Sequence, residues 1–306
     1  MHPAASIIVF TTFSGLGYGL AAILGLGLVD PSSVAVKAAY VASLGLIGLG
    51  LLSSTLHLGN PQRAWRALSQ WRSSWLSREG VMAFATFVPL LWSGFAAVVE
   101  GRIAFVAGAL GALLAAVTVY CTAMIYASLR SVEAWHTRLT PLCYLLFAAA
   151  GGALAAAFAA VAAGQPARPL LVLALALLVA AWTAKAFWRR RLARPGQGST
   201  PETATGLGAI GRVRLFERPH STENYLTREM GFRVARKHAA KLARLALLLG
   251  GIAPALALLA ALAAGGGALA AALLGLALLS HVLGMLTERW LFFAEARHAV
   301  MNYYGG

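Results

Sequence analysis

The chain alternates long apolar runs with shorter polar segments. An α-helix rises about 1.5 Å per residue, so about 20 consecutive apolar residues span the hydrocarbon core of a bilayer. Eight runs of about that length lack interior charges, at residues 6–29, 34–57, 80–99, 103–128, 139–163, 169–188, 242–264 and 267–290. This pattern predicts an all-α integral membrane protein, folded as a bundle of eight transmembrane helices.

Composition and connection length refine this class. Hydrophobic residues make up 59% of the chain and charged residues 11%, which excludes an ordinary soluble domain. Most connections are short, so neighbouring helices are expected to be antiparallel within a single membrane domain covering residues 1–306. The first run has no basic stretch before it, so we expect it to stay in the mature protein. Cys121 and Cys143 lack metal-type spacing and are expected to fill the core.

The basic residues are distributed unevenly between the two sides of the predicted bundle. Of the 25 Lys and Arg residues, only Lys37, Arg102 and Arg168 fall on the side opposite the termini. Short loops rich in Lys and Arg stay in the cytoplasm. The sequence therefore predicts that both termini lie on the cytoplasmic side, and that the chain lies in a bacterial inner membrane.

One connection, at residues 189–241, is long and strongly basic. Residues 185–244 contain fourteen basic and four acidic side chains, which gives +10 of the net charge of +15. One interpretation is attraction to anionic lipid headgroups. The other is a cytoplasmic docking surface for an acidic or iron–sulfur-bearing subunit, because aromatic and Met side chains interrupt the charges as interface anchors do. Its candidate contact residues are Arg212, Arg214, Phe216, Tyr225, Arg228 and Met230. Nucleic acid is not expected, since no recognition module is present.

The second connection, residues 57–79, gathers polar groups between two apolar runs (HLGNPQRAWRALSQWRSSWLSRE). His57 ends one predicted helix and Glu79 opens the next, so both lie at the cytoplasmic edge of the hydrocarbon. A quinone, with a polar ring and an apolar tail, fits such a site. His57 can donate a hydrogen bond, Glu79 can relay protons, and Arg63 or Arg66 can supply positive charge. The alternative is that these polar groups only end helices, since Glu near a helix N-terminus is stabilised by the helix dipole.

Two other protein classes fit less well. A haem-binding cytochrome needs facing axial histidines, and His57 and His281 lie at different depths, so no haem is expected. A membrane transporter needs charged or broken helices near the midplane, and the eight runs lack central charges. His281 is expected to hydrogen-bond a neighbouring helix, with a place in a proton path as the alternative. Glu288 is expected to pair with Arg289 or another basic residue.

Several short motifs together resemble the membrane anchor subunit of dimethyl sulfoxide reductase. The resemblance extends over nearly the whole chain. Its residues are His2-Pro3-Ala4, Phe10-Thr11-Thr12-Phe13-Ser14-Gly15, His57-Leu58-Gly59, Pro61, Arg63-Ala64-Trp65, Ser77-Arg78-Glu79, Ile125-Tyr126-Ala127, Trp135, Thr137, Thr140-Pro141, Asn224-Tyr225, Glu229-Met230-Gly231, Ala235-Arg236-Lys237-His238 and the run from Glu288 to Glu295.

The resemblance implies an eight-helix anchor without haem that binds a quinone, either ubiquinone or menaquinone. It also implies an iron–sulfur subunit that connects the anchor to a molybdopterin catalytic subunit. His57, Arg63 and Glu79 match the positions that this family uses at its quinol site. A cytoplasmic catalytic subunit favours a sulfite dehydrogenase, in which sulfite oxidation reduces quinone. A dimethyl sulfoxide reductase anchor that oxidises menaquinol is the alternative.

Overall fold

The computed structural model describes residues 3–56, 60–193, 199–217, 222, 230 and 234–304. Its described part contains eight helices that are long and apolar enough to cross a membrane. Seven of them are α1 (Ala5–Gly25), α2 (Val34–Thr55), α3 (Trp75–Val98), α4 (Phe105–Ala127), α5 (Leu139–Ala162), α6 (Arg168–Leu192) and α11 (Gly267–Ala294). The remaining span, His238–Ala264, combines α9 (Val234–Leu247), the π-helical turn η2 (Leu248–Ile252) and α10 (Ala253–Ala264). The predicted all-α membrane bundle is thereby confirmed.

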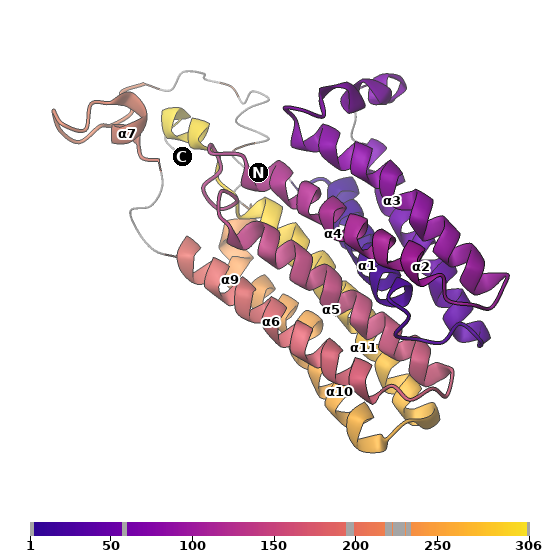
Figure 1. The fold of residues 1–306 in the computed structure, drawn as a ribbon. Helices are drawn as coiled ribbons and strands as arrows, with labels where there is room; N and C mark the ends of the chain where they lie inside the picture. Colours follow the sequence, from indigo (N-terminus) through magenta and orange to yellow (C-terminus); the bar gives the residue numbers. More distant parts are fainter. Residues whose placement is uncertain are drawn as a thin grey trace.

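Four shorter features lie outside the spans. They are the 3-10 helices η1 (Pro61–Gln70) and η3 (Ala299–Tyr304), the short helix α7 (Pro201–Thr205), and an isolated β-bridge between Val132 and His298. Both ends of the described chain lie at the same end of the bundle (Figure 1), as an even number of spans requires.

Several helix ends differ from the predicted ones by four or five residues. The third span begins at Trp75 rather than residue 80, because the Ser74 side chain accepts a hydrogen bond from the Ser77 N–H and caps the helix there. Helices α6 and α11 continue several residues beyond their apolar runs, to Leu192 and Ala294. Hydropathy marks the part of a helix that fits in lipid, whereas capping and tertiary contacts decide where the helix ends.

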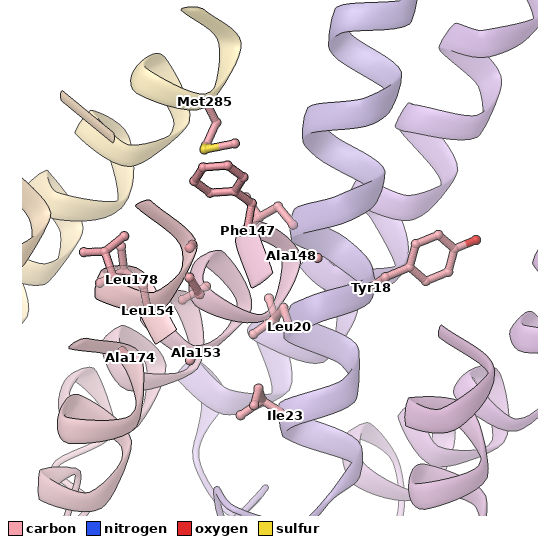
Figure 2. Packing of buried hydrophobic residues seen from close by; sticks show 14 of the residues in the cluster. Tyr18, Leu20, Ile23, Phe147, Ala148, Ala153, Leu154, Ala174, Leu178 and Met285 are labelled. Atoms are coloured by element: carbon pink, nitrogen blue, oxygen red, sulfur yellow. The ribbon is translucent and has the colours of Figure 1, made fainter. Parts of the chain in front are cut away.

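Helices α1 and α5 form the centre of the bundle. In an 18-residue apolar stretch of each of these two helices, 72% is buried inside the protein. The corresponding share is 33–44% in the other six spans. Small residues make the contact possible: a Cβ atom on Gly19 would collide with the backbone of Ala148. Leu20 of α1 lies beside α5, and Met285 of α11 lies over Phe147 of α5 (Figure 2). The other helices therefore pack around this pair.

The end of helix α11, the α4–α5 connection, the segment after α6 and the C-terminal segment pack together at the end of the bundle that holds the termini. We call this group the cap. The Trp135 indole N–H donates to the Phe292 carbonyl oxygen over 2.8 Å, and its ring stacks on Phe292 with centroids 5.4 Å apart. The Asn302 side-chain amide donates to the Ser199 carbonyl oxygen over 2.9 Å. These contacts join the α4–α5 connection, the segment after α6 and the C-terminal segment in one structure.

Candidate functional site

A cavity of about 650 Å³ lies where α1, α2, η1, α3 and α4 meet. Its lining is almost entirely apolar, and a carboxyl group at Glu79 is its single acidic group among the described residues. The lining residues are Ile7, Phe10, Leu51, Leu52, Ser54, Thr55, Ala64, Trp65, Ala67, Leu68, Leu76, Glu79, Gly80, Ala83, Phe84, Phe87, Ile125 and Tyr126. We call this cavity the α1–α4 pocket.

Glu79 lies one helical turn inside α3 rather than at its first residue, because α3 begins at Trp75. Its side chain is buried, with 5% of its surface exposed. Its carboxylate accepts a hydrogen bond from the Thr122 hydroxyl of α4, and Thr122 also contacts the Thr118 carbonyl oxygen at 3.1 Å. A buried carboxyl group is costly unless it is hydrogen-bonded, so Thr122 holds Glu79 in place at the pocket wall.

Helix η1 covers the pocket and is fastened to the start of α3. The Ser77 hydroxyl donates to the Ala67 carbonyl oxygen. The Arg78 guanidinium donates to the Trp71 carbonyl oxygen over 3.0 Å and to the Arg72 carbonyl oxygen over 2.7 Å. Arg78 also lies 4.3 Å from the centre of the Trp75 ring. Sequence reasoning missed this role of Ser77 and Arg78, although both belong to the Ser77-Arg78-Glu79 motif.

None of the other predicted quinone-site residues that the structure describes lines the pocket. His57 lies outside the described residues. Arg63 and Arg66 are exposed and absent from the pocket lining, and Arg66 lies 5.5 Å from the centre of the exposed Trp65 ring. Glu79 is therefore the predicted residue that the described structure places at the pocket.

A buried group of charges lies in the same half of the bundle. The Lys185 ammonium lies 2.6 Å from one Glu288 carboxylate oxygen, and the Arg289 guanidinium lies 3.4 Å from the other. Arg289 also stacks on the Tyr144 ring at 3.8 Å. Side chains at all three charged positions are at most 5% exposed. The expected pairing of Glu288 is confirmed. Its partners Lys185 and Arg289 are buried because α6 and α11 carry them into the core.

A small cavity of about 30 Å³ lies between this charged group and the α1–α4 pocket. Its lining includes Thr12, Thr122, Tyr144 and Arg289. Thr122 is thus shared: it hydrogen-bonds Glu79 and also lines the small cavity that Arg289 faces. Arg289 and the hydrogen-bond partner of Glu79 thus line the same small cavity. The sequence signal was the acid–base pair Glu288-Arg289 placed at the end of an apolar run.

His281 lies two turns deeper in α11 and holds the π-helical turn. Its Nδ1 atom is 2.8 Å from the Gly250 carbonyl oxygen, which also accepts the Trp182 indole N–H over 3.0 Å. The Ser280 hydroxyl donates to the neighbouring Leu249 carbonyl oxygen over 2.7 Å. A π-turn shifts the backbone hydrogen-bond pattern, and these side chains supply partners to its carbonyl groups. The expected hydrogen bond from His281 to a neighbouring helix is confirmed.

Part of the basic connection is described. Its residues Arg212, Arg214 and Phe216 are exposed, Phe216 completely. Tyr225 and Arg228 lie outside the described residues, and Met230 is described only as a half-buried helical position. Glu202 of α7 accepts a hydrogen bond from the Val213 N–H over 3.2 Å. Hydrogen bonds from its own backbone, from Thr200 and from Val213 lower the pKa of Glu202.

Comparisons with known proteins agree with one another. The model of the family described as DMSO reductase anchor subunit (DmsC) matches residues 1–294. The C subunit of sulfite dehydrogenase from Allochromatium vinosum is 32% identical over 328 aligned positions, covering 99% of this protein and 99% of the relative. The corresponding C component of the anaerobic dimethyl sulfoxide reductase of Escherichia coli strain K12 is 26% identical over 174 positions, covering 48% of this protein and 54% of the relative. No solved structure matches the sequence significantly.

Proposed function

The chain belongs to the DMSO reductase anchor subunit family, and from this premise we propose that it is the quinone-reactive membrane anchor of a molybdopterin and iron–sulfur oxidoreductase complex. In this role it passes electrons between the quinone pool and an iron–sulfur subunit. The observation that carries the proposal is the α1–α4 pocket, an apolar cavity with one buried, hydrogen-bonded carboxyl group in its wall.

The pocket fits the shape and chemistry of a quinone. Its volume of about 650 Å³ falls within the range of about 300–1,000 Å³ that is usual for small-molecule sites. Apolar side chains of α2 and α3 suit an isoprenoid tail, and Glu79 supplies a polar group for a ring oxygen. A bound quinone provides two-electron chemistry in which two protons are taken up on reduction and released on oxidation.

Within this site Glu79 exchanges the proton of the ring oxygen beside it. Thr122 fixes the position of the carboxyl group by its hydrogen bond, and a fixed acid–base group within reach of the reacting oxygen is what proton transfer requires. Arg289, held by Glu288 on the other side of Thr122, supplies buried positive charge. His57 and Arg63 remain proposed quinone-site residues, as their match to the family positions implies, and Arg66 remains a further candidate.

We propose that the complex oxidises sulfite and reduces quinone. The sulfite dehydrogenase relative aligns over the full length of this protein, whereas the dimethyl sulfoxide reductase relative aligns over about half of it. The second candidate function, oxidation of menaquinol by a dimethyl sulfoxide reductase anchor, is supported by the family match. In both cases the soluble substrate reacts in the molybdopterin partner.

The basic connection and the cap are the proposed docking side. With the termini in the cytoplasm, the exposed side chains Arg212, Arg214 and Phe216 face a cytoplasmic partner. We assign Tyr225, Arg228 and Met230 to the same contact. Positive charge around an exposed aromatic side chain suits an acidic iron–sulfur subunit.

The Glu79→Gln variant tests the proposed site. The introduced amide keeps the size of the side chain and the hydrogen-bond acceptor for Thr122 but cannot exchange a proton. We expect quinone-coupled electron transfer in the assembled complex to fall about 100-fold, while electron transfer from the soluble substrate to an artificial dye is unchanged.

The matched control for this test is Glu100→Gln. Glu100 pairs with Arg102 at 2.7 Å in the exposed α3–α4 connection, at the end of the bundle away from the pocket. It should leave both reactions unchanged. Normal quinone-coupled transfer in the Glu79→Gln complex would overturn the proposed site.

A further inference from the structure

A second hollow lies where α6 packs against the π-turn and α10. Figure 1 shows α6 and α10 side by side. The volume of the hollow is about 450 Å³. We call it the α6–α10 groove. It is lined by Leu178, Val179, Trp182, Thr183, Ala186, Phe187, Arg190, Leu247, Gly251, Ile252 and Ala255.

The π-turn creates the floor of this groove. Gly251 has no side chain, and a Cβ atom there would lie 2.8 Å from the Trp182 indole nitrogen. The Trp182 ring therefore lies flat against the turn, fixed by its hydrogen bond to the Gly250 carbonyl oxygen. The walls are exposed apolar side chains, including Val179 at 57% and Phe187 at 54% exposure. On a membrane-spanning helix such a surface faces lipid.

The groove has the length of one lipid leaflet. Along α6 it extends from Leu178 to Arg190, and twelve residues of helix rise about 18 Å. Half of the hydrocarbon core measures about 15 Å. Arg190 lies at the end nearest the chain termini, at the level of the headgroups, and Leu178 lies near the middle of the membrane.

Three consecutive arginines lie in the last turn of α6, and their side chains differ in their ion-pair and hydrogen-bond partners. Arg189 pairs with Glu295 at 3.1 Å, and Arg191 donates to the Glu133 carbonyl oxygen over 3.2 Å. Arg190 is exposed, lies 5.9 Å from the Phe187 ring, and forms no ion pair within the described part of the chain. Of the three, Arg190 lines the groove, and within the described part of the chain its guanidinium has neither a carboxylate nor a carbonyl partner.

We propose that the α6–α10 groove binds an anionic phospholipid of the leaflet on the side of the termini. One acyl tail lies over Trp182 between α6 and α10, and the phosphate group pairs with Arg190. Positive side chains near the surface attract anionic headgroups. A quinone ring fits less well, because it carries no negative charge to pair with Arg190. The proposal does not depend on the quinone function.

Native mass spectrometry of the full-length protein, purified with its co-purifying subunits and stripped of lipid, tests the proposal. Phosphatidylglycerol is titrated, with phosphatidylcholine and inorganic phosphate as comparison probes. We expect one phosphatidylglycerol to bind per protein at least about tenfold more tightly than phosphatidylcholine, because the choline ammonium of phosphatidylcholine offsets the phosphate charge that pairs with Arg190. Inorganic phosphate, which has no acyl tail, should not displace it.

Two variants and one control locate the site. Arg190→Gln should abolish the preference for phosphatidylglycerol, and Ala255→Phe, which fills the groove from α10, should weaken binding of both lipids. Arg168→Gln removes an exposed arginine at the opposite end of α6 and should change nothing.

The proposal is overturned if phosphatidylcholine binds equally well, since binding would then be nonselective. It is also overturned if Arg190→Gln behaves like Arg168→Gln, if Ala255→Phe leaves binding unchanged, or if a short-chain quinone displaces the lipid mole for mole.

Discussion

At the scale of single residues, the candidate site depends on polar groups that are buried but paired, either by a hydrogen bond or by an ion pair. Glu79, Thr122 and Arg289 come from three helices, and each has a partner that offsets the cost of removing it from water. Arg63 and Arg66 are exposed, so the described structure supports them less strongly as quinone-site residues than the sequence does. Burial beside the pocket, rather than closeness in sequence, decides which charges act on it.

A matched pair of substitutions on α4 tests the role of the Thr122 hydroxyl. Thr122→Val keeps the shape of the side chain but removes the donor to Glu79. We expect quinone-coupled turnover to fall about tenfold, because a hydrogen bond to a charged group contributes about 1.5–3 kcal/mol. Steady-state turnover with a water-soluble quinone measures the effect.

The control is Thr118→Val, one turn deeper on the same helix. The Thr118 hydroxyl lies 2.9 Å from the Thr86 hydroxyl, is fully buried and lines neither cavity. It should lower thermal stability but keep turnover within about twofold of the unmodified complex, as expected for loss of one uncharged hydrogen bond. Equal losses of turnover in both variants would contradict a specific role for Thr122.

At the scale of elements, the proposed sites depend on short irregular elements between and within the spans as well as on the spans themselves. Helix η1 covers the α1–α4 pocket and is held by Ser77 and Arg78 at the start of α3. The π-turn η2 forms the floor of the α6–α10 groove. Hydropathy locates the spans but does not predict such features, because a π-turn has the same apolar composition as the helix around it.

A charge reversal in the basic connection tests the docking side. The Arg212→Glu/Arg214→Glu/Phe216→Ala variant replaces exposed side chains, so the bundle itself should fold normally. Co-purification of the iron–sulfur subunit should fall at least about tenfold, since interface anchors of this kind each contribute about 1–2 kcal/mol or more.

The comparison variant is Arg168→Glu, which reverses an exposed charge at the opposite end of the bundle. Capture of the iron–sulfur subunit should be unaffected by it. Normal capture by the triple variant, measured by pull-down and iron content, would argue against docking at this connection.

At the scale of the whole molecule, the bundle is asymmetric across the membrane. The α1–α4 pocket, the buried charges, the cap and the basic connection all lie in the half that holds the termini. Quinone chemistry, partner docking and the proposed lipid headgroup are thus proposed for one side. In the proposed complex, this arrangement keeps the distance between the pocket and the iron–sulfur subunit short.

The side of the membrane is open to a direct measurement. A green fluorescent protein fused after Gly306 should fluoresce, and alkaline phosphatase at the same position should be inactive, because the positive-inside rule places the termini in the cytoplasm. The same two reporters fused in the α3–α4 connection, at Gly101, should give the reverse result. Active phosphatase at the C-terminus would overturn the orientation and with it the cytoplasmic catalytic partner.

The sequence by itself determined the class of the protein and its eight spans, and it singled out Glu79 as a candidate site residue. These follow from local properties: the bilayer requires about 20 apolar residues per span, and an acid at the edge of an apolar run is visible without a partner. The matching motifs identified the family for the same reason, since each is a short run of neighbouring residues.

The tertiary structure decided those features that depend on contacts between residues far apart in the sequence. It made α1 and α5 the centre of the bundle, placed Lys185 with Glu288 and Arg289 in the core, and left Arg63 and Arg66 outside the pocket. A charge enters a membrane bundle only where another helix supplies its counter-charge and hydrogen bonds. Hydropathy depends only on neighbouring residues in the sequence, so it does not reveal partners that lie far apart. Lys185 and Glu288, for example, are more than 100 residues apart.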